Sequence, residues 1–143
     1  MQSKRVTGPI TNATVGFAAD EDGHGVAYVA LATDSLEQSL RIPFTVRRYP
    51  ALRQREIGYA AMTAAAERVA EMGCRRVVFH VDDERLVDDV CERRDVPMPL
   101  AIEYVRLGCA LNRFADYKLA LNGESGRDLR ARALAEVTLR VAA

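Results

Sequence analysis

Four acidic residues stand where local patterns predict that a strand ends or a helix begins. Asp20 and Asp82 each follow an apolar run, while Glu56 and Asp116 stand near the predicted beginnings of two helices. Clustered carboxylates repel one another, and proteins tolerate such clusters mainly where cations neutralise them. Oxygen ligands suit Mg²⁺ or Mn²⁺, and two such ions about 4 Å apart could activate a water and stabilise the leaving oxygen of a phosphodiester.

The elements that must position these acids follow from the apolar periodicity. The first three are predicted strands joined as an antiparallel meander, and Pro43 favours an edge position for the third because proline cannot donate to a ladder. Helical spacing of apolar residues then alternates with short apolar runs. The predicted strands are 13–19, 26–32, 40–46, 77–82 and 100–106; the predicted helices are 57–72, 83–93, 112–120 and 128 to the C-terminus.

This order predicts an α/β fold with a five-stranded mixed sheet and helices on both faces. Strands joined through a helix run parallel, and the crossover between them is right-handed. With the third strand at an edge, the fourth must add beside the first, so the strand order should be 3-2-1-4-5. The carboxyl ends of the first and fourth strands then meet where the winding reverses, which is where open α/β sheets bind ligands. We therefore expect Asp20, Glu56, Asp82 and Asp116 to converge at that edge.

The composition is that of one globular domain over residues 1–143, with a polar lead-in at 1–12 and a C-terminal helix at 124–143. Apolar residues make up 49% and charged residues 28%, which excludes disordered and low-complexity classes. Lys plus Arg and Asp plus Glu both total 20, so any nucleic-acid contact must be local. The three cysteines lack metal-site spacing and favour reduced, buried thiols in a cytoplasmic protein; no stretch has the length of a membrane span.

The segments that surround these acids resemble the type 1 ribonuclease H family from about Val15 to Ala120. The first strand ends in Asp20, the helix that follows begins with Glu56 and small residues, and the fourth strand ends in Asp82. The segment Asn112-Arg113-Phe114-Ala115-Asp116 is similar to the family's Asn-x-x-Ala-Asp, and Ile102-Glu103-Tyr104-Val105-Arg106 resembles its fifth strand.

The resemblance implies a ribonuclease H-like fold and metal-dependent hydrolysis of the RNA strand of RNA/DNA hybrids. By the same resemblance Asp20 and Asp82 would be the central ligands of two Mg²⁺ or Mn²⁺ ions. Glu56 would help to hold one ion, and Asp116 would hold the second. The hybrid is the expected partner, with no membrane and no obligate protein partner evident.

Two features of the chain leave their alternatives open. The basic cluster Arg47, Arg48, Arg53 and Arg55 leads directly to Glu56 and would either contact phosphates or lie in a solvated loop. His80 shares a strand face with Asp82, and we expect a buried, hydrogen-bonded histidine rather than a catalytic one.

Two other functions compete with the hydrolase. The first is a catalytically weak or inactive ribonuclease H-like module that binds nucleic acid or protein, which the zero net charge and the short loop Glu21–Gly25 favour. The second is a DNA nuclease of the resolvase kind on the same fold, which the patterns around Glu56 and Asn112 disfavour.

Overall fold

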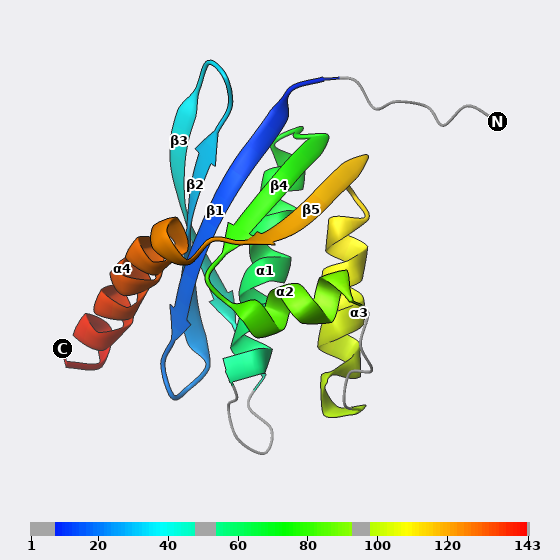
Figure 1. The fold of residues 1–143 in the computed structure, drawn as a ribbon. Coiled ribbons are helices and arrows are strands. Elements are labelled where there is room, and N and C mark those ends of the chain that lie inside the picture. The colour runs from blue at the N-terminus through cyan, green and yellow to red at the C-terminus, as the bar shows by residue number, and fades with distance from the viewer. Residues whose placement is uncertain (1–7, 48–53, 93–97, 143) are drawn as a thin grey trace.

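The computed structural model describes residues 8–47, 54–92 and 98–142. A five-stranded sheet has the order β3-β2-β1-β4-β5, as predicted, with β3 as an edge strand (Figure 1). β1 pairs antiparallel with β2 and parallel with β4, and β4 pairs parallel with β5. The strands are β1 Ile10–Ala19, β2 His24–Ala32, β3 Glu37–Thr45, β4 Arg76–Val81 and β5 Asp116–Leu121.

Helices cover both faces of the sheet, also as predicted. On one face α1 packs against α3 and the sheet, and the main core forms between them around Tyr59, Met62 and Phe79. On the other face α4 lies alone across β1 and β2 (Figure 1), where Ala133 and Val137 pack against Val26 and Tyr28. The helices are α1 Gln54–Glu71, α2 Glu84–Cys91, the 3₁₀ turn η1 Met98–Leu100, α3 Ala101–Leu111 and α4 Gly123–Ala142.

The prediction for residues 100–120 is wrong in both of its elements. The segment 100–106 belongs to η1 and α3 rather than to a strand, and 116–121 is the fifth strand rather than part of a helix. The buried residues of this segment are Leu100, Leu107 and Leu111, which recur at helical spacing, whereas Ile102 is exposed. The burial pattern therefore follows the 3.6-residue period of a helix rather than the alternation of a strand. Asn112 consequently ends α3 as its C-cap instead of beginning a helix.

The cysteines agree with only part of what the sequence suggests. Cys74, Cys91 and Cys109 are free thiols, but Cys91 and Cys109 are exposed, which corrects the expectation that all three are buried. Among the described residues, no helix is long and apolar enough to cross a membrane.

Candidate active site

The register between β1 and β4 decides which residue of β1 stands beside Asp82. Val15 pairs with Val81, so the next position along both strands places Gly16 beside Asp82. Asp20 lies four residues further along, roughly 13 Å at the usual rise of a strand. There its carboxylate closes the β1–β2 turn, accepting the backbone N–H groups of Asp22 at 2.9 Å and His24 at 3.0 Å. The structure therefore separates Asp20 from Asp82.

Asp116 stands at the opposite edge of the sheet. It begins β5 and pairs with Arg76, the first residue of β4, whereas Asp82 follows the last residue of β4. Five strand steps, about 16 Å, separate the two ends. The Asp116 carboxylate lies 3.8 Å from the guanidinium of Arg76. Its predicted place beside the other acids depended on a helix that the chain does not form there.

Glu56 lies in the first turn of α1, where it is 5% exposed, and Asp82 is partly exposed at the end of β4. Across the described residues, no group of three or more His, Cys, Asp or Glu side chains is placed to hold a metal ion. The prediction that Asp20, Glu56, Asp82 and Asp116 form one acidic pocket is therefore wrong. For Asp20 the physical cause is register, because the first strand runs past the end of the fourth.

Glycines, arginines and the carboxylate of Asp83 lie around Asp82. A Cβ added to Gly16 would overlap the backbone of Leu129 and Arg130, and one added to Gly126 would lie 2.9 Å from the Asp82 backbone nitrogen. The guanidinium of Arg130 lies 3.1 Å from Asp82 Oδ2. Strand glycines often mark the close approach of another backbone, so Gly16 carried a signal that sequence reasoning missed.

A cavity of about 570 Å³ opens between this point and the beginning of α1. Its walls combine Phe17 and Ile57 with Gln54, Asp83 and Arg127. Asp83 is the N-cap of α2 and accepts the Leu86 N–H at 3.1 Å, as its position in the sequence predicts. Burial raises the pKa of the Asp83 carboxyl, and the nearby charges of Asp89 and Asp82 raise it further.

The predicted basic cluster divides into residues with different roles. Arg55 binds Asp89 through two hydrogen bonds of 2.9 and 2.8 Å, so it is committed to an internal ion pair rather than open to phosphate. Arg47 is exposed at the end of β3. Arg48 and Arg53 lie outside the described residues.

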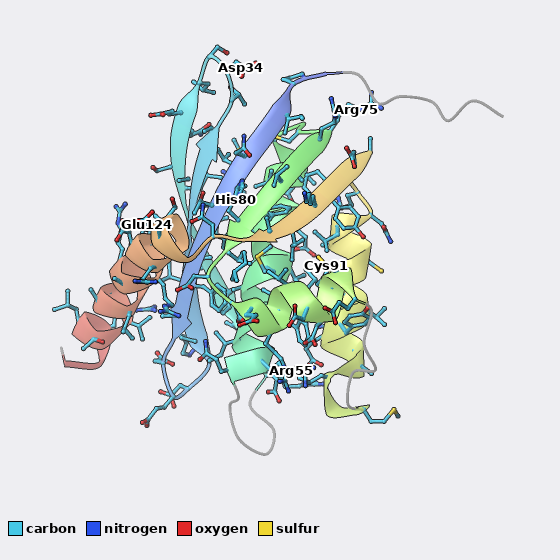
Figure 2. All side chains as sticks on the ribbon, viewed as in Figure 1. Asp34, Arg55, Arg75, His80, Cys91 and Glu124 are labelled. Atoms are coloured by element: carbon cyan, nitrogen blue, oxygen red, sulfur yellow. The ribbon has the colours of Figure 1, made fainter. Side chains whose placement is uncertain are left out.

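His80 is hydrogen-bonded, as expected, but it is only partly buried. Its Nε2 lies 3.0 Å from Asn12 Oδ1 on the face of the sheet that carries α4 (Figure 2). Burial, together with the charge of Lys118, lowers the pKa of the imidazole.

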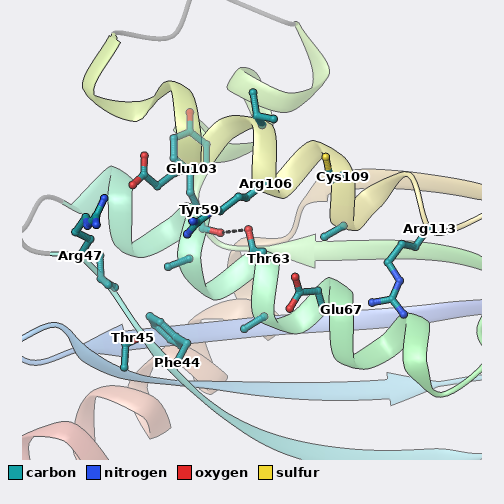
Figure 3. A pocket seen from close by; sticks show the side chains of 15 residues that line it. Phe44, Thr45, Arg47, Tyr59, Thr63, Glu67, Glu103, Arg106, Cys109 and Arg113 are labelled. Carbon is teal, nitrogen blue, oxygen red and sulfur yellow. Dashed lines mark hydrogen bonds between the residues drawn. The ribbon is translucent and has the colours of Figure 1, made fainter.

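A second cavity, of about 560 Å³, lies between β3, α1 and α3. The floor of the cavity is formed by small side chains of α1, namely Ala60, Thr63 and Ala64. Because these side chains are short, they leave space between the end of β3 on one side and α3 on the other. Arg47 and Arg106 stand at one end, from opposite walls, and Arg113 stands at the other end near Glu67 (Figure 3). Sequence reasoning found Arg47 but missed Arg106, which lies in α3, and Arg113, which follows the C-cap of that helix.

The fold is that of ribonuclease H. No protein-family model and no curated protein matches the sequence. The ribonuclease H1 of Halobacterium salinarum is 18% identical with a TM-score of 0.68, covering 89% of this chain and 98% of that one. An N-terminal ribonuclease H domain from Mycobacterium tuberculosis is 12% identical with a TM-score of 0.71, covering 94% and 99%. LC11-RNase H1, solved with an RNA/DNA hybrid, is 11% identical with a TM-score of 0.66, covering 90% and 99%. The chain thus shares its architecture with these enzymes.

Proposed function

We propose that this chain is a ribonuclease H-fold domain that binds RNA/DNA hybrids without hydrolysing them. The observation that supports this function is the neighbourhood of Asp82: Gly16, Gly126 and Arg130 stand close to it, and Asp83 is the other carboxylate among the described residues that line the cavity. Two-metal hydrolysis requires two cations about 4 Å apart, held by several shared oxygen ligands. Since the described residues offer no such group, the binding module is favoured over the hydrolase.

The donor set around Asp82 does not fit the two Mg²⁺ or Mn²⁺ ions that the resemblance implies. A hard divalent cation takes carboxylate oxygens, and a neighbouring guanidinium repels it. Asp82 has Arg130 beside it, and Arg127 lines the same cavity. Asp20 and Asp116 lie too far away to complete a shell. We therefore assign no catalytic step to a metal ion at this position.

Two observations support an RNA/DNA hybrid as the ligand: one similar structure and three arginines that line the cavity between β3, α1 and α3. LC11-RNase H1 has been solved with an RNA/DNA hybrid. On this chain Arg47, Arg106 and Arg113 line one cavity, and none has a carboxylate partner among the described residues. Arginine contacts to phosphate supply most of the sequence-independent affinity of such complexes. Glu67 and Glu103 share the cavity walls, so we expect weak binding that added salt abolishes.

The experiment is a paired cleavage and binding assay with a labelled RNA/DNA hybrid, in Mg²⁺, in Mn²⁺ and in chelator. We expect no metal-dependent product, with binding that weakens as salt rises. Arg106→Ala should weaken binding, while Arg75→Ala, which removes the same charge from the far end of β4 (Figure 2), should not. Matched duplex DNA and a four-way junction test the resolvase alternative.

Two results would overturn the proposal in different ways. Metal-dependent hybrid cleavage that Asp82→Asn abolishes would restore the hydrolase. Failure to bind hybrid at any salt concentration, with a folded chain, would leave a protein-interaction module as the better function.

A further inference from the structure

The carboxylate of Asp82 stands beside a cation that the chain itself supplies. Arg130 Nη2 lies 3.1 Å from Asp82 Oδ2, and this buried oxygen accepts no hydrogen bond from the described residues. Its neutralisation therefore depends on charge rather than on a hydrogen-bond network. The Arg130 side chain is half exposed and that of Asp82 is 20% exposed. Both residues line the cavity between the sheet and the beginning of α1.

The backbone of α4 is seated so that this pair can form. Gly16 lets the helix backbone at Leu129 and Arg130 rest on β1, and Gly126 lets the first turns of α4 rest on Asp82. A side chain at either glycine would force the helix away from the strand. The two glycines and Arg130 therefore act together: close approach of the helix brings the guanidinium to the carboxylate.

We infer that Arg130 is a built-in cation, which occupies the place beside Asp82 that a divalent ion would need. This inference rests on the proposed function, since it gives the physical reason why the residues at this position do not fit a divalent ion. A buried carboxylate is costly without an opposite charge. Arg130 supplies that charge permanently, so the folded chain is independent of divalent cations in this region.

The inference predicts that loss of Arg130 uncovers a weak cation site. In Arg130→Gln the Asp82 carboxylate loses its partner while Asp83 remains its neighbour in the same cavity. One or two carboxylates with water suffice for weak Mg²⁺ or Mn²⁺ binding. We expect Mn²⁺ to raise the Tm of Arg130→Gln and to leave the Tm of the wild-type chain unchanged. The matched control is Arg127→Gln, which removes the same charge from the same cavity and keeps the Arg130–Asp82 pair.

A double-mutant cycle with Asp82→Asn completes the experiment. Arg130→Gln alone should lower the Tm most, because it leaves the buried Oδ2 of Asp82 without its cation, and the double variant should lower it less than the sum of the two single changes. Mn²⁺ should not rescue the double variant. Arg130→Lys, which keeps the charge, should lose less stability than Arg130→Gln and should not respond to Mn²⁺.

The inference is overturned if Arg130→Gln and Arg127→Gln have the same Tm and the same Mn²⁺ response, or if the wild-type Tm rises with Mn²⁺ in a way that Asp82→Asn abolishes. The readout is thermal unfolding without nucleic acid. Hybrid cleavage would therefore refute the proposed function on separate evidence, and loss of the Arg130 coupling would refute only this inference.

Discussion

The guanidinium of Arg55 in α1 binds both carboxylate oxygens of Asp89 in α2, and Asp89 is 1% exposed. The hydroxyl of Tyr59 also donates to Asp89. Burial alone would raise the pKa of Asp89, but the hydrogen bonds from Arg55 and Tyr59 hold it below its ordinary value. This pair joins the two helices on one side of the sheet.

Arg55→Ala should therefore destabilise the chain by about 3 kcal/mol, because it leaves a buried carboxylate without its partner. The measurement is denaturant unfolding, with Arg113→Ala as the control for an exposed arginine. Arg55→Ala should not reduce hybrid binding at temperatures where the variant is folded. A large loss of binding at unchanged stability would show that Arg55 contacts phosphate, which is one of the two alternatives that the sequence left open.

Glu136, in α4, makes the stability of the folded chain depend on pH in the acid range. It accepts two hydrogen bonds from Arg41, at 2.7 and 2.8 Å, and one from the Tyr28 hydroxyl. These contacts, the Arg41 hydrogen bond above all, lower the pKa of Glu136 to about 2. The unfolded chain therefore takes up the Glu136 proton at higher pH than the folded chain does. The stabilisation is complete above the ordinary carboxyl pKa of 4.5 and is lost as pH falls towards 2.

The test compares the Tm of the wild-type chain and of Glu136→Gln across this acid range. The difference between them should be largest above pH 5 and should shrink steadily on acidification. High salt should also reduce it, since Arg41 is half exposed and solvent ions screen the pair. A difference that stays constant with pH would contradict the assigned pKa.

The glycines beneath α4 give a third prediction. Gly16→Ala should cost about 3 kcal/mol of stability and Gly126→Ala about 2 kcal/mol, because backbone must move to admit each methyl group. Gly108→Ala in α3 is the matched control. It meets nothing within 4 Å, and alanine should stabilise the helix there by about 0.5–1 kcal/mol. Equal losses at all three glycines would show that α4 does not rest on β1 as described.

The sequence was sufficient for the strand order of the sheet but not for the position of Asp20 in the site. Strand order depends on coarse features, such as Pro43 at an edge and helices between parallel strands, and these survive errors in the elements themselves. A site depends on register, in which the choice between Asp20 and Gly16 beside Asp82 is a matter of four residues. No local pattern fixes how far β1 runs past β4.

The error at Asp116 has a different origin. The segment from Leu100 to Leu111 is apolar enough to fit a strand or a helix, and only burial at helical spacing distinguishes them. Once that segment is a helix, Asp116 falls at the beginning of the last strand, at the wrong edge. Arg130 could not have been predicted, because its partner is set by the seating of α4 on two glycines.

Mn²⁺ binding to the wild-type chain tests the central claim most directly, and it can be counted from the electron paramagnetic resonance signal of the free ion. If Arg130 occupies the place of a metal ion, the wild-type chain should have no site that saturates at submillimolar Mn²⁺. The titration curve of Asp82→Asn should then be the same as that of the wild-type chain. One or two ions bound tightly by the wild-type chain, and lost in Asp82→Asn, would contradict it.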